Sequence, residues 1–338
     1  MLDTVQLGLG EAEALAAAAL EASGATASNA RATARALVAA EADGQAGHGL
    51  SRVPPYAMHA RCGKVDGRAV PRVEQVAAAA LRIDAGNGYA YPAIDAALAA
   101  LAPLARASGI AVAVLHRSHH FGQAGAHAER MAAAGLVGLV LGNTPKAMAF
   151  WGGRRPMLGT NPLAFAAPLP AARAPLVVDL AISVAARGKV VAAQKAGRSI
   201  PDGWALDAAG QPTTDPTAAL AGTLMPIGGA KGAALALLVE VLAAALTGSA
   251  WGWEASSFFD DQGGPPALGQ VFIALDPGPL SGGAYASRMG VLLEVITADP
   301  DVRLPGERRL ALRDRAAREG LSIARPLHDE IQALLRHS

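Results

Sequence analysis

The stretch Ile110-Ala-Val-Ala-Val-Leu115 is followed by His116-Arg-Ser-His-His-Phe-Gly122 and then by the Ala-rich segment Gln123–Ala134. A short, β-branched, apolar run after Gly109 predicts a buried strand, and segment 123–134 predicts a helix. Strand, polar loop and helix in succession indicate an α/β protein, whose loops commonly carry the groups that contact a ligand. No Gly-x-Gly-x-x-Gly stands at a strand-to-helix junction, so a standard Rossmann nucleotide site is not expected.

Similar patterns extend in both directions along the chain. Apolar runs predict further strands at residues 76–83, 136–141, 163–167, 175–180 and 270–275. Ala-, Leu- and charge-rich segments predict helices at residues 10–23, 28–42, 92–107, 181–195 and 284–298, and in the C-terminal stretch that ends at His337.

Composition excludes several classes of protein. The 338 residues are 52% hydrophobic but only 4% aromatic, and 29 Lys and Arg against 28 Asp and Glu give a net charge of +1. Without a basic block, a nucleic-acid surface is not expected. The longest apolar run, residues 232–246, is interrupted by Glu240 and too short for a bilayer, so no membrane partner is expected. A single cysteine and an acidic N-terminus without a basic region predict a cytoplasmic protein.

The segment 43–56 places chemically useful side chains four residues apart. It contains His48, Arg52 and Tyr56 between two Ala-rich helices. In one helical turn, His48 and Arg52 would project from the same face. A histidine can donate a proton near neutrality and a guanidinium can grip a carboxylate, which suits a small 2-oxo, 2-imino or 2-hydroxy acid. The alternative is an ordinary surface pair at a helix end.

Two other patterns leave alternatives open. Three histidines within residues 116–120 suggest a metal, but adjacent His119 and His120 point in different directions and no cysteine or carboxylate pair is nearby. We therefore expect no metal site and instead a ligand-contacting histidine at the strand end. The glycine-rich segment 227–232, with Lys231, is either an anion site at a helix N-terminus or an ordinary loop-to-helix junction.

Together, these segments resemble the malate/L-lactate dehydrogenase family of non-Rossmann type. That family includes sulfolactate, ureidoglycolate and diketogulonate enzymes and the Δ1-piperideine-2-carboxylate (ketimine) reductases. The resemblance covers nearly the whole chain and is carried by six pieces in order: Gly47-His-Gly49 with Arg52 and Tyr56, Ser118-His-His-Phe-Gly122, Gly159-Thr-Asn-Pro162, Val178-Asp-Leu-Ala-Ile-Ser183, Ala230-Lys-Gly232 and Pro305-Gly-Glu-Arg308.

The resemblance implies a fold, a domain division and an assembly. It implies an α/β (α+β) protein with a non-Rossmann nucleotide-binding domain, built on a mixed, largely antiparallel sheet, and with a helical N- and C-terminal domain. Residues 1–75 with 305–338 would form the helical substrate and dimerisation domain. Residues 76–304 would bind the nicotinamide cofactor and carry a helical insertion at about 184–248. The expected assembly is a homodimer.

The resemblance also implies an activity, an NAD(P)H-dependent interconversion of a small 2-oxo acid and its 2-hydroxy acid. His48 would be the proton donor, and Arg52 would clamp the carboxylate of a small-molecule substrate. Thr160 and Tyr56 would also touch substrate. The cofactor contacts would be His120, Val178, Asp179, Leu180, Ser183, Lys231, Pro305, Gly306 and Glu307.

Two departures from the family bear on the substrate. Most relatives have serine where this chain has Gly47, and the ketimine reductases have aspartate where it has Lys189. The outer members of a Ser-His-Asp relay are therefore absent, which favours malate, lactate or sulfolactate chemistry over cyclic imine reduction. Reduction of Δ1-piperideine-2-carboxylate or Δ1-pyrroline-2-carboxylate is the alternative, and a catalytically weak binding protein is another. Lys231 and Arg308 favour NADP over NAD, because either could meet a 2′-phosphate.

Overall fold

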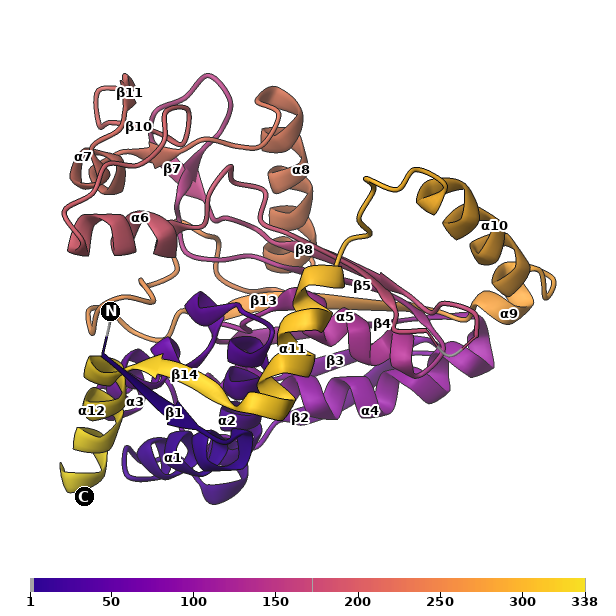
Figure 1. The fold of residues 1–338 in the computed structure, drawn as a ribbon, viewed down its shortest axis with the longest axis horizontal. Helices are drawn as coiled ribbons and strands as arrows, with labels where there is room; N and C mark the ends of the chain where they lie inside the picture. The colour runs from indigo at the N-terminus through magenta and orange to yellow at the C-terminus, as the bar shows by residue number, and fades with distance from the viewer. Residues whose placement is uncertain (1–2, 172, 338) are drawn as a thin grey trace.

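The computed structural model describes residues 3–171 and 173–337, and its centre is a seven-stranded sheet (Figure 1). The strands stand in the order β2-β3-β4-β13-β5-β8-β9. Their bounds are Arg72–Ala77 (β2), Ala80–Asp84 (β3), Ile110–Ser118 (β4), Leu268–Leu275 (β13), Val137–Gly142 (β5), Leu163–Ala167 (β8) and Leu176–Leu180 (β9). Neighbours run antiparallel except β3 and β4, which are parallel. This confirms the mixed, largely antiparallel sheet.

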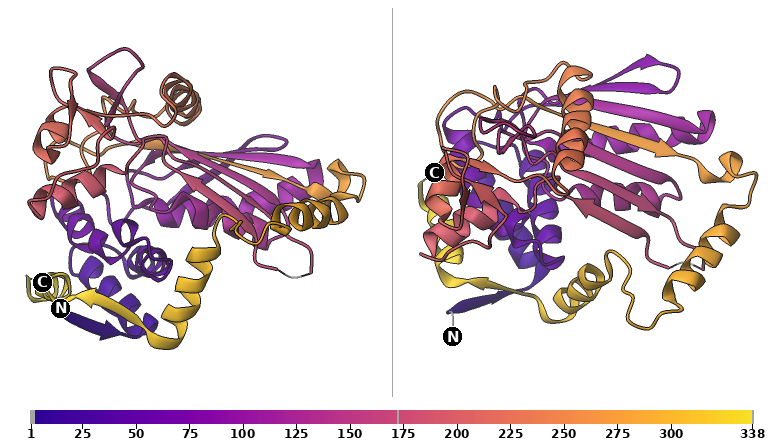
Figure 2. Two further views of the ribbon diagram at one scale, coloured as in Figure 1. Left: turned by 45° about the horizontal axis from the view of Figure 1, so that its top comes forward. Right: turned by 90° about the horizontal axis from the view of Figure 1, so that it is seen from above.

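Helices cover both faces of this sheet, as Figure 2 shows in its left view. One face packs on α4 (Ala90–Ser108) and α5 (Ala124–Ala133) through a core of Ala, Leu, Ile and Val. The other face packs on α8 (Ala230–Glu240) and the π-helical turn Val241–Ala245 that continues it. Alanine-rich faces permit this close approach of helix and sheet, so a core with few aromatic residues is sufficient.

The two ends of the chain share a second core. Strand β1 (Thr4–Leu7) pairs antiparallel with β14 (Leu321–Ala324), although more than 300 residues separate them in sequence. Around this ribbon pack the helices α1 (Leu9–Glu21), α2 (Ala27–Ala42), α3 (Val53–Arg61), α11 (Glu307–Glu319) and α12 (Arg325–Leu334), and the short 3-10 turn Leu335–His337 ends the described chain. The helices were predicted from sequence, whereas the ribbon was not.

A third group of elements lies between β5 and β13 in sequence. Its small sheet has the order β11-β10-β12-β6-β7. The strands are Met148–Ala149 (β6), Pro156–Leu158 (β7), Ala205–Leu206 (β10), Pro212–Thr213 (β11) and Thr223–Leu224 (β12), and the helices are Arg187–Lys195 (α6) and Pro216–Ala221 (α7). The region expected to be a helical insertion therefore also contributes strands.

Two local predictions were wrong in their boundaries, whereas the helix expected over 284–298 is present as α10 (Tyr285–Thr297). Residues 76–83 do not form one strand, because the chain turns between β2 and β3 to make a hairpin. The helix expected over 181–195 begins only at Arg187, because Ile182 N donates to Thr160 O (2.8 Å) and Ser183 Oγ to Ala185 O (2.7 Å). Helix α10 follows the short α9 (Pro277–Leu280) and stands beside the sheet as an arm (Figure 1).

No helix in the described part of the chain is both long enough and apolar enough to span a bilayer. The apolar run around α8 is instead a sheet-packing helix, and Glu240 at its end is buried.

Candidate active site

The segment between α2 and α3 brings His48 and Arg52 to one cavity by a route other than the single helical turn expected. Residues Ala46–His48 and Leu50–Arg52 form two 3-10 turns that meet at Gly49. Glycine is required there, because a Cβ would lie 2.1 Å from Glu41 Oε2, which accepts a hydrogen bond from Leu50 N (2.8 Å). Arg52 Nε donates back to Gly47 O (2.7 Å), which fixes the guanidinium beside His48.

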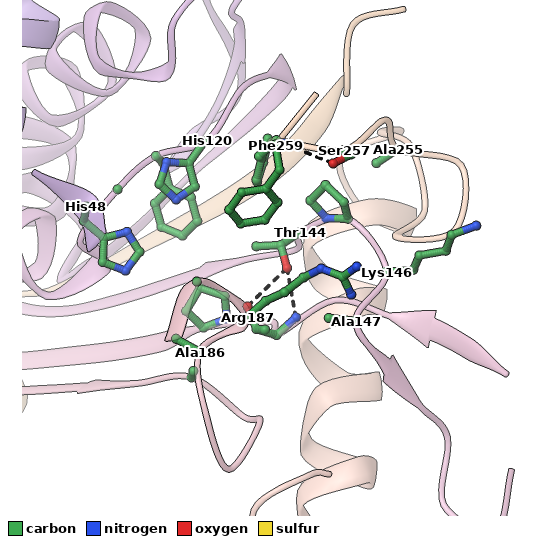
Figure 3. A pocket seen from close by; sticks show the side chains of 18 of the residues that line it. His48, His120, Thr144, Lys146, Ala147, Ala186, Arg187, Ala255, Ser257 and Phe259 are labelled. Carbon is green, nitrogen blue, oxygen red and sulfur yellow. Dashed lines mark hydrogen bonds between the residues drawn. The ribbon is translucent and has the colours of Figure 1, made fainter. Parts of the chain in front are cut away.

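His48 and Arg52 line a cavity of about 360 Å³ where the three groups of elements meet (Figure 3). The lining also includes the predicted residues His120, Thr160 and Asp179, so the structure brings these five together. A second, larger cavity of about 1130 Å³ reaches His48 and Arg52 from the other side and runs along Lys189 and Lys195 of α6. The volume of the first cavity is in the range of small-molecule sites.

His120 forms one wall of the cavity and is held from behind. Its ring stacks on that of His48, with centroids 5.3 Å apart and planes 15° apart. Its Nδ1 lies 2.6 Å from the Tyr56 hydroxyl. Burial raises the pKa of Tyr56 and lowers that of His120, so the phenol stays protonated and donates to a neutral imidazole. Tyr56, predicted to touch substrate, is thus outside the cavity and positions His120.

A second pair of histidines supports a loop that covers the cavity. His59 Nε2 lies 3.1 Å from Asp260 O and must donate to this carbonyl, so its Nδ1 accepts from His119 Nε2 (3.1 Å). Burial lowers the pKa of both rings, that of His59 to about 4, so this neutral arrangement holds. The loop residue Phe259 lies over Arg52, with the guanidinium carbon 5.2 Å from the ring centroid.

Lys64 fastens the same loop and was missed at the level of sequence. Its side chain is fully buried, and Nζ donates to the carbonyls of Ser257 (2.7 Å), Gln262 (2.9 Å) and Asp260 (3.0 Å). Three charged hydrogen bonds from one ammonium fix the relative positions of these carbonyl groups and so the conformation of the loop. A lysine that follows Cys62-Gly63 carries no local signal of this role, because its partners are more than 190 residues away.

Thr160 belongs to the Gly159–Pro162 turn, which a buried carboxylate holds. Glu240 accepts from Asn161 Nδ2 (2.7 Å), Asn143 Nδ2 (3.2 Å) and Gly252 N (2.7 Å). Asn161 has a φ of 39°, a left-handed conformation that asparagine tolerates better than most residues. Thr160 N donates to Thr144 Oγ1 (2.9 Å), and both threonines line the cavity. Thr144 is labelled in Figure 3.

Strand β9 carries Asp179, which lines the cavity as His120 does, whereas the remaining predicted cofactor residues lie outside the cavity lining. Asp179, between Val178 and Leu180, accepts from Gly125 N (2.8 Å) at the start of α5. In the turn Pro305–Glu307, Gly306 has a left-handed φ of 94°. This turn lies against strand β9, since a Cβ at Gly306 would be 3.5 Å from Val177 O. At the other end, Ser183 pairs with Pro226, and Ile227 N donates to Ile182 O (2.8 Å), three residues before α8 begins. Lys231 is exposed in the first turn of that helix.

The residues predicted to contact the cofactor lie near one edge of the central sheet. Strand β9 is an edge strand, so no other strand of that sheet pairs with the backbone groups on its outer side. Its residue Asp179 lines the cavity. The predicted contacts follow this edge from Gly306 to Ser183 and on to Lys231. No group of three or more His, Cys, Asp or Glu side chains in the described chain is placed to hold a metal ion.

A buried ionic cluster sets the distance between the His48 segment and α5. Arg313 donates to both Asp43 (2.7 Å) and Glu129 (2.8 Å), and Arg309 donates to Glu129 (2.8 Å). Asp43 also accepts from Gln123 Nε2 (3.1 Å), a cavity residue. The cluster therefore ties together α2, α5 and α11, three helices from distant parts of the sequence.

The cavity itself has an excess of positive charge. Arg52, Arg187 and Lys146 line it, whereas Asp179 is the single acidic residue among its described lining. Neither Arg52 nor Arg187 forms an ion pair within 4.0 Å with any described carboxylate. Burial and the charge of Arg52 lower the pKa of His48 to about 4. Such a site is built for anions.

Comparison with known proteins agrees with this geometry. The malate/L-lactate dehydrogenase family matches residues 8–332. The (2R)-3-sulfolactate dehydrogenase (NADP⁺) of Chromohalobacter salexigens is 51% identical over 327 residues, 97% of each chain. A Δ1-pyrroline-2-carboxylate/Δ1-piperideine-2-carboxylate reductase of Pseudomonas putida is 44% identical over 90% of this chain and 89% of its own.

Solved structures give the same answer. The Δ1-piperideine-2-carboxylate reductase of Pseudomonas syringae superposes with a TM-score of 0.92 at 38% identity, over 98% of this chain and 100% of that one. A sulfolactate dehydrogenase from Methanocaldococcus jannaschii superposes with a TM-score of 0.89 at 28% identity, over 98% of this chain and 97% of the other. The protein therefore belongs to the malate/L-lactate dehydrogenase family.

Proposed function

We propose that the protein is an NADP-dependent oxidoreductase that interconverts a small 2-oxo acid and its 2-hydroxy acid. One observation carries this proposal: His48 and the guanidinium of Arg52, which has no described carboxylate within 4.0 Å, face the same cavity, beside an open sheet edge suited to a nucleotide. The sulfolactate dehydrogenase at 51% identity, which is named for NADP⁺, supports both the reaction and the cofactor.

The residues divide the chemistry as follows. When bound, a nicotinamide cofactor supplies the hydride that reduces C2. Arg52 holds the substrate carboxylate through charged hydrogen bonds, and Phe259 covers the guanidinium and excludes water from it. His48 gives its proton to the oxygen on C2 in reduction and takes it back in oxidation. His120 keeps the imidazole of His48 in place by stacking.

We propose that the cofactor is held along β9 and by the segments beside it. The contacts would come from His120, Val178, Asp179, Leu180 and Ser183, with Lys231 and the turn Pro305–Glu307 at the two ends. Residues 1–75 with 305–338 would form the substrate and dimerisation domain, and 76–304 the cofactor domain. Thr160 would contact substrate, and Tyr56 would act on it through His120.

We also propose a homodimer, because the arm at α10 has an apolar face without a cover. Val291, Leu292 and Val295 are 49%, 45% and 70% exposed, while Leu293 is the buried residue of this helix. Apolar faces of this kind mark association surfaces. Sedimentation of the purified protein would give a dimer mass, and a monomer at micromolar concentration would refute the assembly.

The reaction is tested by following the absorbance of reduced cofactor. Purified protein is assayed with NADPH or NADH against pyruvate, oxaloacetate, sulfopyruvate and Δ1-piperideine-2-carboxylate. His48→Ala should lower kcat by about 10²–10⁴-fold, the range for loss of a general acid. His328→Ala is the matched control, since this residue lies on α12 and outside the cavity. Equal activity of the two variants would refute the role of His48.

The second candidate, a ketimine reductase, is favoured by the relatives that reduce cyclic imines. It is opposed by Lys189, which borders the second cavity where a carboxylate would support His48. Rapid reduction of the imine, with no turnover of any oxo acid, would establish this candidate in place of the first.

A further inference from the structure

Arg187 is a cation of the active-site cavity that the proposed chemistry does not use. It begins α6, and its guanidinium reaches across the cavity to the side away from His48, towards Thr144 (Figure 3). Among the described residues, the single polar contact of its side chain is a long hydrogen bond from Nη2 to Leu220 O (3.5 Å). A cation at the first turn of a helix also opposes the helix dipole, so this position does not stabilise α6.

The contrast with other inward-facing arginines shows that Arg187 lacks a carboxylate partner among the described residues. Arg309 and Arg313 are satisfied by Asp43 and Glu129 at 2.7–3.3 Å. Arg187 has no described carboxylate within 4.0 Å, although burial lowers its pKa and so disfavours its charge. A desolvated guanidinium that faces a cavity and has no carboxylate within ion-pair distance is a preformed site for an anion.

Arg187 also lines the same cavity as the first carboxylate clamp, Arg52. Its chain neighbour Gly188 lies against Arg52, since a Cβ at Gly188 would be 4.0 Å from Arg52 Nη2. Both guanidinium groups therefore serve one cavity of about 360 Å³, the first near His48 and the second across from it. A short acid with its carboxylate on Arg52 and C2 at His48 would extend its far end towards Arg187.

We propose that Arg187 binds a second anionic group, a sulfonate or a carboxylate, at the far end of a short substrate. The site therefore selects dianionic 2-oxo and 2-hydroxy acids over monoanionic ones. This assignment rests on the proposed function, because Arg52 must hold the first carboxylate. Lys146 lines the same cavity but is exposed, and it has no part in the assignment.

The test compares selectivity in variants of the whole protein. The quantity measured is kcat/KM for sulfopyruvate and for oxaloacetate, each divided by kcat/KM for pyruvate. Wild type should favour a dianion, and Arg187→Met should reduce the ratio by about 10–100-fold, as expected for loss of a charged hydrogen-bonded pair. Arg187→Lys should restore part of the ratio, and Arg198→Met, at an exposed cation that lines neither cavity, should leave it unchanged. The larger drop, for sulfopyruvate or for oxaloacetate, identifies the anion.

Each other outcome has a definite meaning. If wild type reduces none of the three acids, the proposed function fails and the role of Arg187 fails with it. If wild type is active but its ratios equal those of both Arg187 variants, only the role of Arg187 is overturned. If the variants raise KM for NADPH but not for NADH and keep the ratios, Arg187 serves the cofactor phosphate, which also overturns the assignment. Should Arg187→Met fail to fold, Arg187→Gln supplies the uncharged variant.

Discussion

Acidification should accelerate the reductive reaction, because His48 is almost entirely unprotonated at neutral pH. Burial and Arg52 lower its pKa from 6.5 to about 4. At about pH 7 a group of pKa ~4 is protonated in roughly one molecule in a thousand, and the pKa change is equivalent to ~3.4 kcal/mol between the two charge states. Reduction needs the protonated form, so kcat/KM should rise about tenfold for each pH unit between about pH 8 and pH 5.

The opposite direction provides an internal control. Oxidation of the hydroxy acid needs neutral His48 as the base, so its kcat/KM should stay level from about pH 6 upwards. Both directions are assayed with the same protein at saturating cofactor. A plateau of the reductive kcat/KM between about pH 5 and pH 7 would refute the lowered pKa.

A charge change on α6 tests whether charges in the second cavity influence the pKa of His48. Lys189 borders the cavity that reaches His48 from the far side, and Lys189→Asp should raise the pKa of His48 and move the reductive plateau towards neutrality. Lys195→Asp is the matched control further along the same helix. Equal pH profiles for both variants would show that position 189 has no electrostatic access to His48.

Loss of folding stability in acid sets the lowest pH at which activity can be assayed. Burial lowers the pKa of His59 and of His127 to about 4. The folded state therefore binds fewer protons than the unfolded state, so the stabilisation these groups give is complete above about pH 6.5 and is lost as pH falls towards about 4. Activity measured at low pH must accordingly recover on return to neutral pH.

Two further substitutions test the supports of the site. Lys64→Met should cost about 3 kcal/mol in unfolding free energy and speed hydrogen exchange in residues 255–262, because three carbonyls lose their donor. Unchanged exchange in that loop would contradict the role of Lys64. Glu240→Ala should cost about 3–5 kcal/mol in denaturant unfolding and lower kcat, because it frees the turn that carries Thr160. An unchanged kcat together with a lowered denaturant midpoint would show that this turn does not contribute to catalysis.

Local patterns predicted the central elements because their signals lie within single segments. The apolar run at Ile110 became β4 and the Ala-rich segment after Gly122 became α5, each within a few residues of the expected ends. The ribbon of β1 and β14 could not be predicted in this way. Each strand is four residues long, and its stabilising partner lies at the other end of the sequence.

The residues of the candidate site also differ in whether a local sequence pattern marks them. The spacing of His48 and Arg52 marked them as candidates, and their roles were assigned from the resemblance to the family; Gly49 breaks the expected helical turn into two. Phe259 and Lys64 had no signal, since what they contact comes from distant segments. Arg187 had no such signal either, because the helix was expected to begin at residue 181. Only its observed start at Arg187 places this cation in the first turn, where the helix dipole disfavours it.

The charges of the cavity couple substrate binding to protonation. Desolvation is the first cause of the lowered pKa of His48, and Arg52 is the second. A substrate carboxylate cannot relieve the first cause, but it neutralises Arg52 and so removes the second. Binding therefore raises the pKa of His48 and favours uptake of the proton that the reduction consumes. The pH dependence of kcat, which reports the bound state, should then be shifted to higher pH than that of kcat/KM. If Arg187 holds a second anion, the shift should be larger for oxaloacetate or sulfopyruvate than for pyruvate.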